Sequence, residues 1–547
     1  MPPASVPTDS SRESALNRGH APSGPLRLWL VVTLVMTCTT AYGAPGTQPS
    51  SDADKSMLVA PMSPQPLVKF ELSGWLRSRA QWLHGTSLGN GVGGLPHALS
   101  VQRDAASYRS TAADFGLTEL RLRLEPRMTL AHHIEVGAQL DVAAGALFGA
   151  VDSGPVWLEG DGRDSSWVAA RRAWGRLGLF GLATLTMGRV GDHFGLGAWR
   201  NDGRDRLNDW QSDVDRVALS AQALGFDLML ARDSMASLPI PTSTAGLSAS
   251  LQDSADVTRW LIQASAGKLD NEAGLRWSIA LSYQDQAVAL RIEHDNQALD
   301  ELDAGCADAG KCVQLVPRDA MIITPQGHVH WRKRTPLGLI DLQAEGLIRF
   351  ASVDNTDVLV NTDTSKIFIG GALVGDMQIT QGHNRWRLRG GWVSGDDAGG
   401  FGVRDQSNLT ALDPDTKQVV QRDWVTGMSL HRGYLVDGLL YREIVGAVAN
   451  SWYLRPAFGR QWGAADTGLE IELACLVAGA FLSGSTPGKA SSLGIEPELR
   501  VSGGLGRWGT LMLNGSLLLP GSALDAGKGG TAASHAWRLS AVWLVDL

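Results

Sequence analysis

The chain has 547 residues, a formal net charge of −8, 64 glycines, 44% hydrophobic residues and 19% charged residues. A mean hydropathy of −0.05 excludes a multi-helix membrane protein, and the high apolar fraction excludes a disordered chain. The negative net charge gives no electrostatic argument for binding nucleic acid. No Pro-rich or charged linker divides the chain after residue 66, so one very large all-β unit fits better than several domains.

An export signal is predicted at the N-terminus. Scattered arginines precede the apolar run 28–36, and small residues follow it up to Gly43. This order is typical of a secretory signal peptide, and the run has about half of the ~20 residues that a spanning helix needs. We therefore expect residues 1–43 to be a signal peptide and residues 44–66 to be a flexible periplasmic lead-in.

From residue 67 onward the dominant pattern is an alternation of apolar and polar residues with a period of two. Such alternation predicts β-strands with one apolar and one charged face. In 384–394, for example, two tryptophans and a leucine alternate with three arginines. The same pattern is clear in 67–82, 117–130, 339–352 and 537–545.

Long polar connections alternate with short ones along the chain, as in outer-membrane barrels with long extracellular loops and short periplasmic turns. The long connections are expected at about 83–114, 145–166, 191–212, 233–255, 296–319, 353–364, 396–449, 482–490 and 520–534. The short ones are expected near 131–132, 179–181, 224, 267–272, 335–338, 380–382, 461–466 and 504–507. They predict eighteen strands with both ends on the periplasmic side, if 273–295 is one tall strand with a bulge near Asp285 and Gln286. Sixteen strands is the alternative.

A soluble sandwich or propeller would also alternate, so the positions of the aromatic residues matter. Tryptophans lie mostly near segment ends, where the interfacial girdles of membrane barrels form: Trp82, Trp174, Trp260, Trp331, Trp386, Trp392, Trp452, Trp508, Trp537 and Trp543. A large soluble barrel would need an apolar interior, whereas here one whole face is charged. The predicted fold is all-β, a single large antiparallel transmembrane β-barrel over 67–547 in the outer membrane of a Gram-negative bacterium.

Several short motifs carry a family resemblance. They are the segment 187–197 (MGRVGDHFGLG) with the polar residues that follow it, 391–397 (GWVSGDD) and 442–446 (REIVG). With these motifs the chain resembles a Gram-negative porin-type barrel. More specifically it resembles an uncharacterised outer-membrane family found mainly in myxobacteria, which is reminiscent of alginate-export barrels. The resemblance implies a barrel but no characterised activity. Such barrels usually end in an aromatic residue, whereas this chain ends in Leu547.

The charged faces of the strands are expected to line the lumen. Same-face neighbours are about 6.6 Å apart, so the three arginines of 384–394 would form a ladder roughly 13 Å tall. Such ladders favour the passage of anions, either small solutes or an anionic polysaccharide. The alternative is a cross-strand lattice of salt bridges that stiffens the wall. The predicted pore-lining residues are Arg77, Arg79, Arg121, Arg123, Arg332, Arg334, Arg385, Arg387 and Arg389.

Other features have two readings each. The Gly-rich segment 188–203 either folds inward and narrows the pore or forms a surface loop. Cys306 and Cys312 share one predicted loop in an oxidising compartment, so a small disulfide ring is plausible. His328 and His330 share a strand face, and lumen polarity explains them better than metal binding because their strand has no nearby carboxylate.

No H-E-x-x-H or Walker motif occurs in the sequence, so no catalytic residue, metal or cofactor is expected. The predicted function is a passive outer-membrane channel. The alternatives are a structural or surface-binding barrel with a closed lumen, and a membrane hydrolase with a Ser–His pair. Expected partners are outer-membrane lipid, the barrel-assembly machinery and the anionic cargo, with a homo-oligomer left open.

Overall fold

The computed structural model describes most of the compact unit Pro66–Leu547. The described residues are 68–89, 114–130, 133–147, 168–235, 257–294, 311–353, 366–396, 401, 411–412, 419–420, 424–464, 467–527 and 530–547. The predicted signal peptide and lead-in lie outside them. Cys306 does too, so its disulfide with Cys312 stays a prediction.

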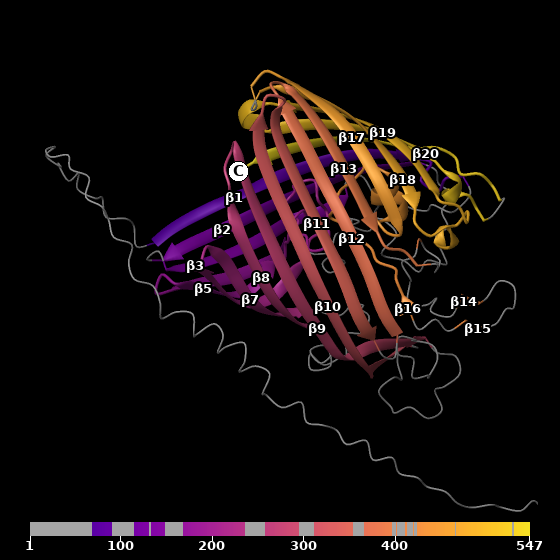
Figure 1. The fold of residues 1–547 in the computed structure, drawn as a ribbon. Helices are drawn as coiled ribbons and strands as arrows, with labels where there is room; N and C mark the ends of the chain where they lie inside the picture. Colours follow the sequence, from indigo (N-terminus) through magenta and orange to yellow (C-terminus); the bar gives the residue numbers. More distant parts are fainter. Residues whose placement is uncertain are drawn as a thin grey trace, which may run out of the picture. The chain divides into compact units, whose positions relative to one another are not determined.

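Eighteen strands of the described chain form one closed barrel. Each strand pairs antiparallel with the next, and the last pairs with the first across the β1–β21 seam (Figure 1). This confirms the predicted all-β barrel and its strand number. The strands are β1 (Val68–His84), β2 (Asp114–Leu130), β3 (Ile134–Leu147), β4 (Val168–Leu179), β5 (Ala183–Gly191), β6 (Asp213–Ala223), β7 (Phe226–Met235), β8 (Val257–Leu269), β9 (Ala273–His294), β10 (Lys311–Thr335), β11 (Gly338–Val353), β12 (Lys366–Gln381), β13 (Asn384–Val393), β17 (Ser451–Trp462), β18 (Leu469–Ala480), β19 (Ser492–Gly504), β20 (Thr510–Pro520) and β21 (Ala536–Asp546).

Short elements occupy the connections. β16 pairs parallel with the first residues of β12, and β14 and β15 pair only with each other. None of the helices in the described residues is long and apolar enough to cross a membrane. The bounds are β14 (Ala411–Leu412), β15 (Val419–Val420), β16 (Trp424–Val425), the π-helix η3 (Leu440–Val445) and the 3-10 helices η4 (Ser483–Ser485), η5 (Gly506–Trp508) and η6 (Ser522–Leu524).

The predicted alternation of long and short connections is confirmed, and β1 begins and β21 ends on the side of the short turns. The β6–β7 turn shows why such turns can be tight. Leu224 and Gly225 both have positive φ, 55° and 81°, which is the geometry of a two-residue hairpin loop.

The expectation for 273–295 needs a small correction. β9 is one tall strand, as predicted, but the register shift lies in its neighbour β10, between Pro317 and Ala320. Proline has no N–H to give to the ladder, which explains an irregularity on that strand. In addition, β10 already begins at Lys311, so the expected connection 296–319 is shorter.

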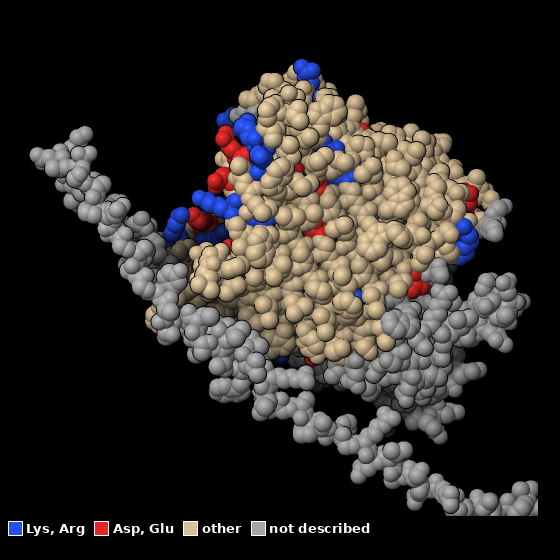
Figure 2. All heavy atoms as spheres, viewed as in Figure 1, with Lys and Arg blue, Asp and Glu red and all other residues tan. Residues whose placement is uncertain are grey.

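The two faces of the wall differ in chemistry. Large apolar side chains are exposed on the outside, while arginines and carboxylates are buried on the inside. In Figure 2 the visible wall is almost entirely uncharged, and charged residues gather toward its edges. Most of the predicted tryptophans face outward. Trp174 does not, because its ring lies over Gly137 on the inner face, where only glycine leaves room for it.

Candidate functional site

Two connections fold into the barrel and contact its inner wall. The first inner segment is 192–212, between β5 and β6, and the second is 426–450, between β16 and β17. Arg77 Nη1 donates to the carbonyl of Arg206 (2.8 Å), and Arg538 Nη1 donates to the carbonyl of Gly438 (2.7 Å). The inward reading of the Gly-rich segment is therefore confirmed, and a second inner segment joins it.

One end of the first inner segment is fixed by a buried carboxylate. Asp192 accepts hydrogen bonds from Arg200 (3.2 Å), Arg216 (2.9 Å) and Arg259 (2.7 Å). Burial opposes the ionisation of Asp192, but the three guanidinium groups outweigh burial and hold the pKa of this carboxyl below its usual range. The segment is thus tied to β6 and β8 by a charged cluster.

The other end is fixed by Asp209. This carboxylate pairs with Arg77 (2.5 Å) and Arg79 (2.9 Å) of β1, and with Arg442 (2.7 Å) of the second inner segment. Burial opposes ionisation here as well, yet these arginines hold the pKa of Asp209 well below its usual range. Asp209 therefore joins the wall and both inner segments at one point.

The middle of the first inner segment binds β11 through Glu345. The Oε2 atom of this buried carboxyl group accepts backbone hydrogen bonds from Leu196 (2.7 Å) and Ala198 (3.3 Å). Gly195 has a φ of +54° here, and a Cβ at this position would meet Glu345 and His328. The glycines of the motif thus allow the backbone to approach the wall closely.

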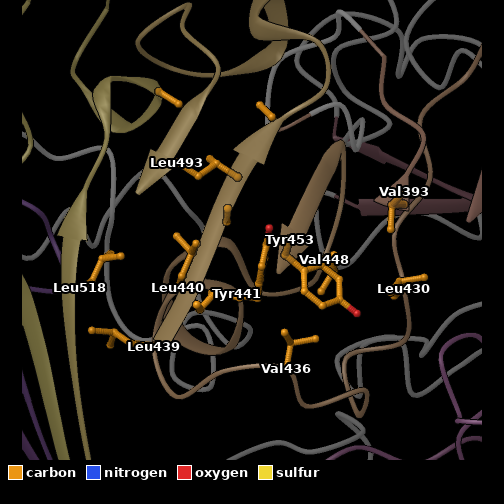
Figure 3. Close-up of a cluster of buried hydrophobic side chains, with 14 of the residues drawn as sticks. Val393, Leu430, Val436, Leu439, Leu440, Tyr441, Val448, Tyr453, Leu493 and Leu518 are labelled. Atoms are coloured by element: carbon orange, nitrogen blue, oxygen red, sulfur yellow. The ribbon is translucent and has the colours of Figure 1, made fainter. Parts of the chain in front are cut away.

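The second inner segment docks through apolar packing and backbone hydrogen bonds. Leu439 and Leu440 are fully buried in a cluster with Leu476, Leu493 and Leu518 of the wall (Figure 3). Glu496 of β19 accepts the N–H groups of Gly438 (3.1 Å) and Leu440 (2.8 Å). Free N–H groups in the first turn of η3 are satisfied in this way.

The two segments also contact each other. Asn201 and Asn208 both donate to the carbonyl of Gly433, at 3.1 Å and 2.9 Å. The backbone N–H of His431 donates to the carbonyl of Ala198 (2.8 Å). The inner segments therefore form one connected body across part of the lumen.

A Ser–His pair lies at this junction, and its geometry does not suit a nucleophile and base. His431 Nε2 is 3.0 Å from Ser212 Oγ, while Gly433 N–H donates to His431 Nδ1 (2.9 Å). Nδ1 is then an acceptor, so Nε2 carries the proton and donates to the serine. Burial lowers the pKa of His431 to about 4. The hydrolase alternative gains no support from this pair.

A cavity of about 360 Å³ lies between the inner segments and the wall. Its lining carries more positive than negative groups: eight arginines (Arg79, Arg204, Arg387, Arg389, Arg442, Arg455, Arg500 and Arg538) and five carboxylates (Asp205, Asp376, Asp437, Glu472 and Glu498). Such a lining attracts anions and can exchange hydrogen bonds with them.

The nine predicted pore-lining arginines differ in burial and in the groups that they contact. Four are buried where the first inner segment meets β1 and β2: Arg77, Arg79, Arg121 and Arg123. Arg387 and Arg389 line the cavity and pair with Asp376, while Arg385 pairs with Glu470 and Glu472. Arg332 pairs with Asp341, and the exposed Arg334 with Glu272.

The nine predicted pore-lining arginines do not include five that line the cavity: Arg204, Arg442, Arg455, Arg500 and Arg538. Arg455 alternates with apolar residues along β17, so the period-two pattern could have revealed it. Arg442 lies in the REIVG motif, which marks η3. The carboxylate nearest to His330 comes from the adjacent strand β11 rather than from its own strand: Asp341 Oδ1 lies 2.9 Å from His330 Nε2. No group of three metal-ligating side chains forms within the described ranges.

Replacing Asp209 tests its role as the joining point. We expect Asp209→Ala to lower the free energy of unfolding by about 3–5 kcal/mol, because buried arginines lose their partner. Asp227→Ala, which breaks an exposed pair with Arg276, should cost at most about 1 kcal/mol. Urea unfolding in detergent measures both, and equal losses would contradict the assignment.

Asp437 gives a pH-dependent prediction. Burial raises its pKa to about 7; the Tyr441 N–H opposes this and Glu498 adds to it. Ionising a carboxyl with a raised pKa costs folded stability progressively as pH rises from about 4 to about 7. Asp437→Asn should therefore stabilise the protein more at pH 8 than at pH 4, by urea unfolding. If Asp437→Asn raised the free energy of unfolding equally at both pH values, the raised pKa of Asp437 would be contradicted.

Comparison with known proteins gives structural likenesses at low identity. The chain matches Pseudomonas aeruginosa OccK11 (OpdR) at 12% identity and a TM-score of 0.42, over 87% of this chain and 96% of that one. A BenF-like porin from Pseudomonas fluorescens Pf-5 matches at 10% identity and a TM-score of 0.42, over 87% of this chain and 99% of that one. Pseudomonas aeruginosa OpdK, solved with vanillate, matches at 12% identity and a TM-score of 0.42, over 87% of this chain and 99% of that one. No family model and no curated protein matches the chain.

Proposed function

We propose that this chain is a Gram-negative outer-membrane channel that passes small anionic solutes. The observation that carries the proposal is the cavity beside the inner segments, where arginines outnumber carboxylates eight to five. The excess positive charge raises the local concentration of anions and lowers the barrier to their passage.

The outer surface supports a membrane location. On β11 the outward apolar face runs from Ile340 to Phe350, which at about 3.3 Å per residue and a tilt of about 40° is about 25 Å tall. That height equals the apolar band of an outer-membrane barrel, about 25 Å. A closed barrel leaves no unpaired strand edge in lipid. The predicted signal peptide agrees with export.

The inner segments favour a small solute over a polymer. They cross part of the lumen and contact walls on both sides, from β1 and β8 to β11 and β19. A polysaccharide chain would need an unobstructed path, whereas a small anion can pass through the hydrated space beside the segments. Passage of a small anion through this hydrated space needs no covalent chemistry.

A barrel with a closed lumen is the second candidate, and one observation favours it. Arg387 and Arg389 share Asp376, and Arg385 pairs with Glu470 and Glu472. Paired arginines stiffen a wall and attract anions less than free ones. The two candidates differ in conductance, because a structural barrel would not pass ions.

The finer family assignment is part of the proposal. Two of the three motifs that resemble the myxobacterial outer-membrane family coincide with inner segments, since 187–197 enters the first and 442–446 forms most of η3. The position of these two motifs supports the assignment to that family, with the inner segments as its shared feature. Outer-membrane lipid and the barrel-assembly machinery are the partners that such a barrel needs.

Reversing the cavity charge tests the channel. We expect Arg387→Glu combined with Arg389→Glu to weaken or reverse the anion preference, because both guanidinium groups line the cavity. The measurement is the reversal potential of single channels under a salt gradient in planar bilayers. Arg507→Glu, in a short turn outside the cavity, should leave selectivity unchanged. Unchanged selectivity in the double variant would refute guidance by these arginines, and a barrel that never conducts would support the closed alternative.

A charge on the outer face tests the membrane location. Leu373 faces outward midway along β12, so Leu373→Arg should destabilise the barrel in lipid vesicles by about 2–4 kcal/mol. Gln343→Arg places the same charge on the inner face of β11 and should cost much less. Equal losses in urea unfolding would argue against a lipid-facing wall at Leu373.

A further inference from the structure

Two arginines at the short-turn end of the barrel lie over exposed tryptophan rings. The guanidinium carbon of Arg460 is 5.4 Å from the ring centroid of Trp462, the last residue of β17. In η5 the guanidinium carbon of Arg507 is 4.8 Å from the ring centroid of Trp508. The two rings are 43% and 61% exposed. Because an aromatic face attracts a cation, the rings hold both arginines at the surface.

Neither Arg460 nor Arg507 has an ion-pair partner among the residues that the structure describes, and both are exposed. Lys268, near another short turn, differs in this respect because it lies 3.9 Å from Asp270. Lys333 of β10 is exposed and unpaired within the same residues, but no aromatic ring lies under its ammonium group. The two arginines therefore combine an unbalanced positive charge with an aromatic support.

Arg460 lies at the periplasmic limit of the apolar band. Two exposed tryptophans, Trp452 and Trp462, are ten residues apart on the outward face of β17. At about 3.3 Å per residue and a tilt of about 40°, they differ in height by about 25 Å, which equals the apolar band of an outer-membrane barrel. Lipid phosphates of the periplasmic leaflet lie just beyond this limit, so the guanidinium group can reach them.

Apolar side chains continue the surface from Arg460 into the band. Trp386 of β13 contacts Phe458 of β17 on the outer face, with ring centroids 4.4 Å apart. The strand register places Asn384 beside Arg460, in the row next to these rings. A headgroup at Arg460 thus has a polar amide beside it, while its acyl chain can lie along Trp386 and Phe458.

The turn η5 presents Arg507 in a similar way. Trp543 Nε1 of β21 donates to the carbonyl of Trp508 (2.8 Å), and this bond fixes the turn against the wall. Leu505, just before η5, is 47% exposed and adds apolar surface. The combination of an unpaired arginine, an exposed tryptophan ring and neighbouring apolar surface therefore occurs at both places.

We propose that Arg460 with Trp462, and in the same way Arg507 with Trp508, binds the headgroup of an anionic phospholipid in the periplasmic leaflet. A guanidinium group can donate two parallel hydrogen bonds to a phosphate. Phosphatidylethanolamine also carries an ammonium group, which needs a carboxylate that neither pair offers. Phosphatidylglycerol carries a single net negative charge, and the arginine balances it. The inference rests on the membrane location, but not on anion passage through the lumen.

Native mass spectrometry of the barrel, expressed from the full chain and purified in detergent, tests the proposal. It is titrated separately with phosphatidylglycerol and phosphatidylethanolamine of the same acyl chains. We expect the unaltered barrel to bind phosphatidylglycerol more tightly. Arg460→Gln combined with Arg507→Gln should remove this preference, by about fivefold for each arginine. The matched control is Lys268→Gln with Arg334→Gln, which removes two exposed cations that have carboxylate partners and should keep the preference.

Three results would overturn the proposal: equal binding of the two lipids by the unaltered barrel, an undiminished preference in the Arg460 and Arg507 double variant, or an equal loss in the control. Glycerol 3-phosphate, which has the phosphate but no acyl chain, should not displace the lipid at equal concentration, and displacement would contradict a lipid site. Heat-modifiable migration confirms that each variant has folded. None of the four residues lines the cavity, so single-channel selectivity should not change, and a barrel that fails to conduct leaves the lipid result intact.

Discussion

The ion pairs of Asp209 hold the interior of this barrel together. One carboxylate of the first inner segment meets Arg77 and Arg79 from the wall and Arg442 from the second inner segment. Burying these charges is tolerable only because each has a partner. Asp192, Glu345 and Glu496 hold the inner segments at other points, but only Asp209 joins the wall and both segments at one place.

Arginine thus has two roles in the lumen, and one residue can have both: the buried Arg79 pairs with Asp209 of the first inner segment and also lines the cavity. The Arg77 side chain is fully buried and fixes an inner segment, while Arg389 keeps 22% of its surface and lines the cavity. Both arginines alternate with apolar residues in the same way along their strands. The difference between them comes from the loops that fold over the strands, and only an arginine that keeps contact with solvent can guide a solute.

Most of the fold follows from the sequence because strand alternation and turn spacing are local. The eighteen strands, the long and short connections and the tall β9 could all be predicted in this way. The site depends on contacts between distant residues. Arg442 and Asp209 are 233 positions apart, and no period or motif links them. Trp174 was misplaced for a similar reason, since its inward position depends on Gly137 of the neighbouring strand.

The β1–β21 seam has a consequence for biogenesis. β1 is the first barrel strand to leave the ribosome and must wait for β21, the last, so the seam is among the slowest contacts to form. Arg77 and Arg79 lie on β1, and Arg206 of the first inner segment pairs with Asp546 at the end of β21. The same segment therefore touches both sides of the seam. Closing the barrel and seating its interior are one event, and an assembly intermediate with an open seam lacks a finished pore.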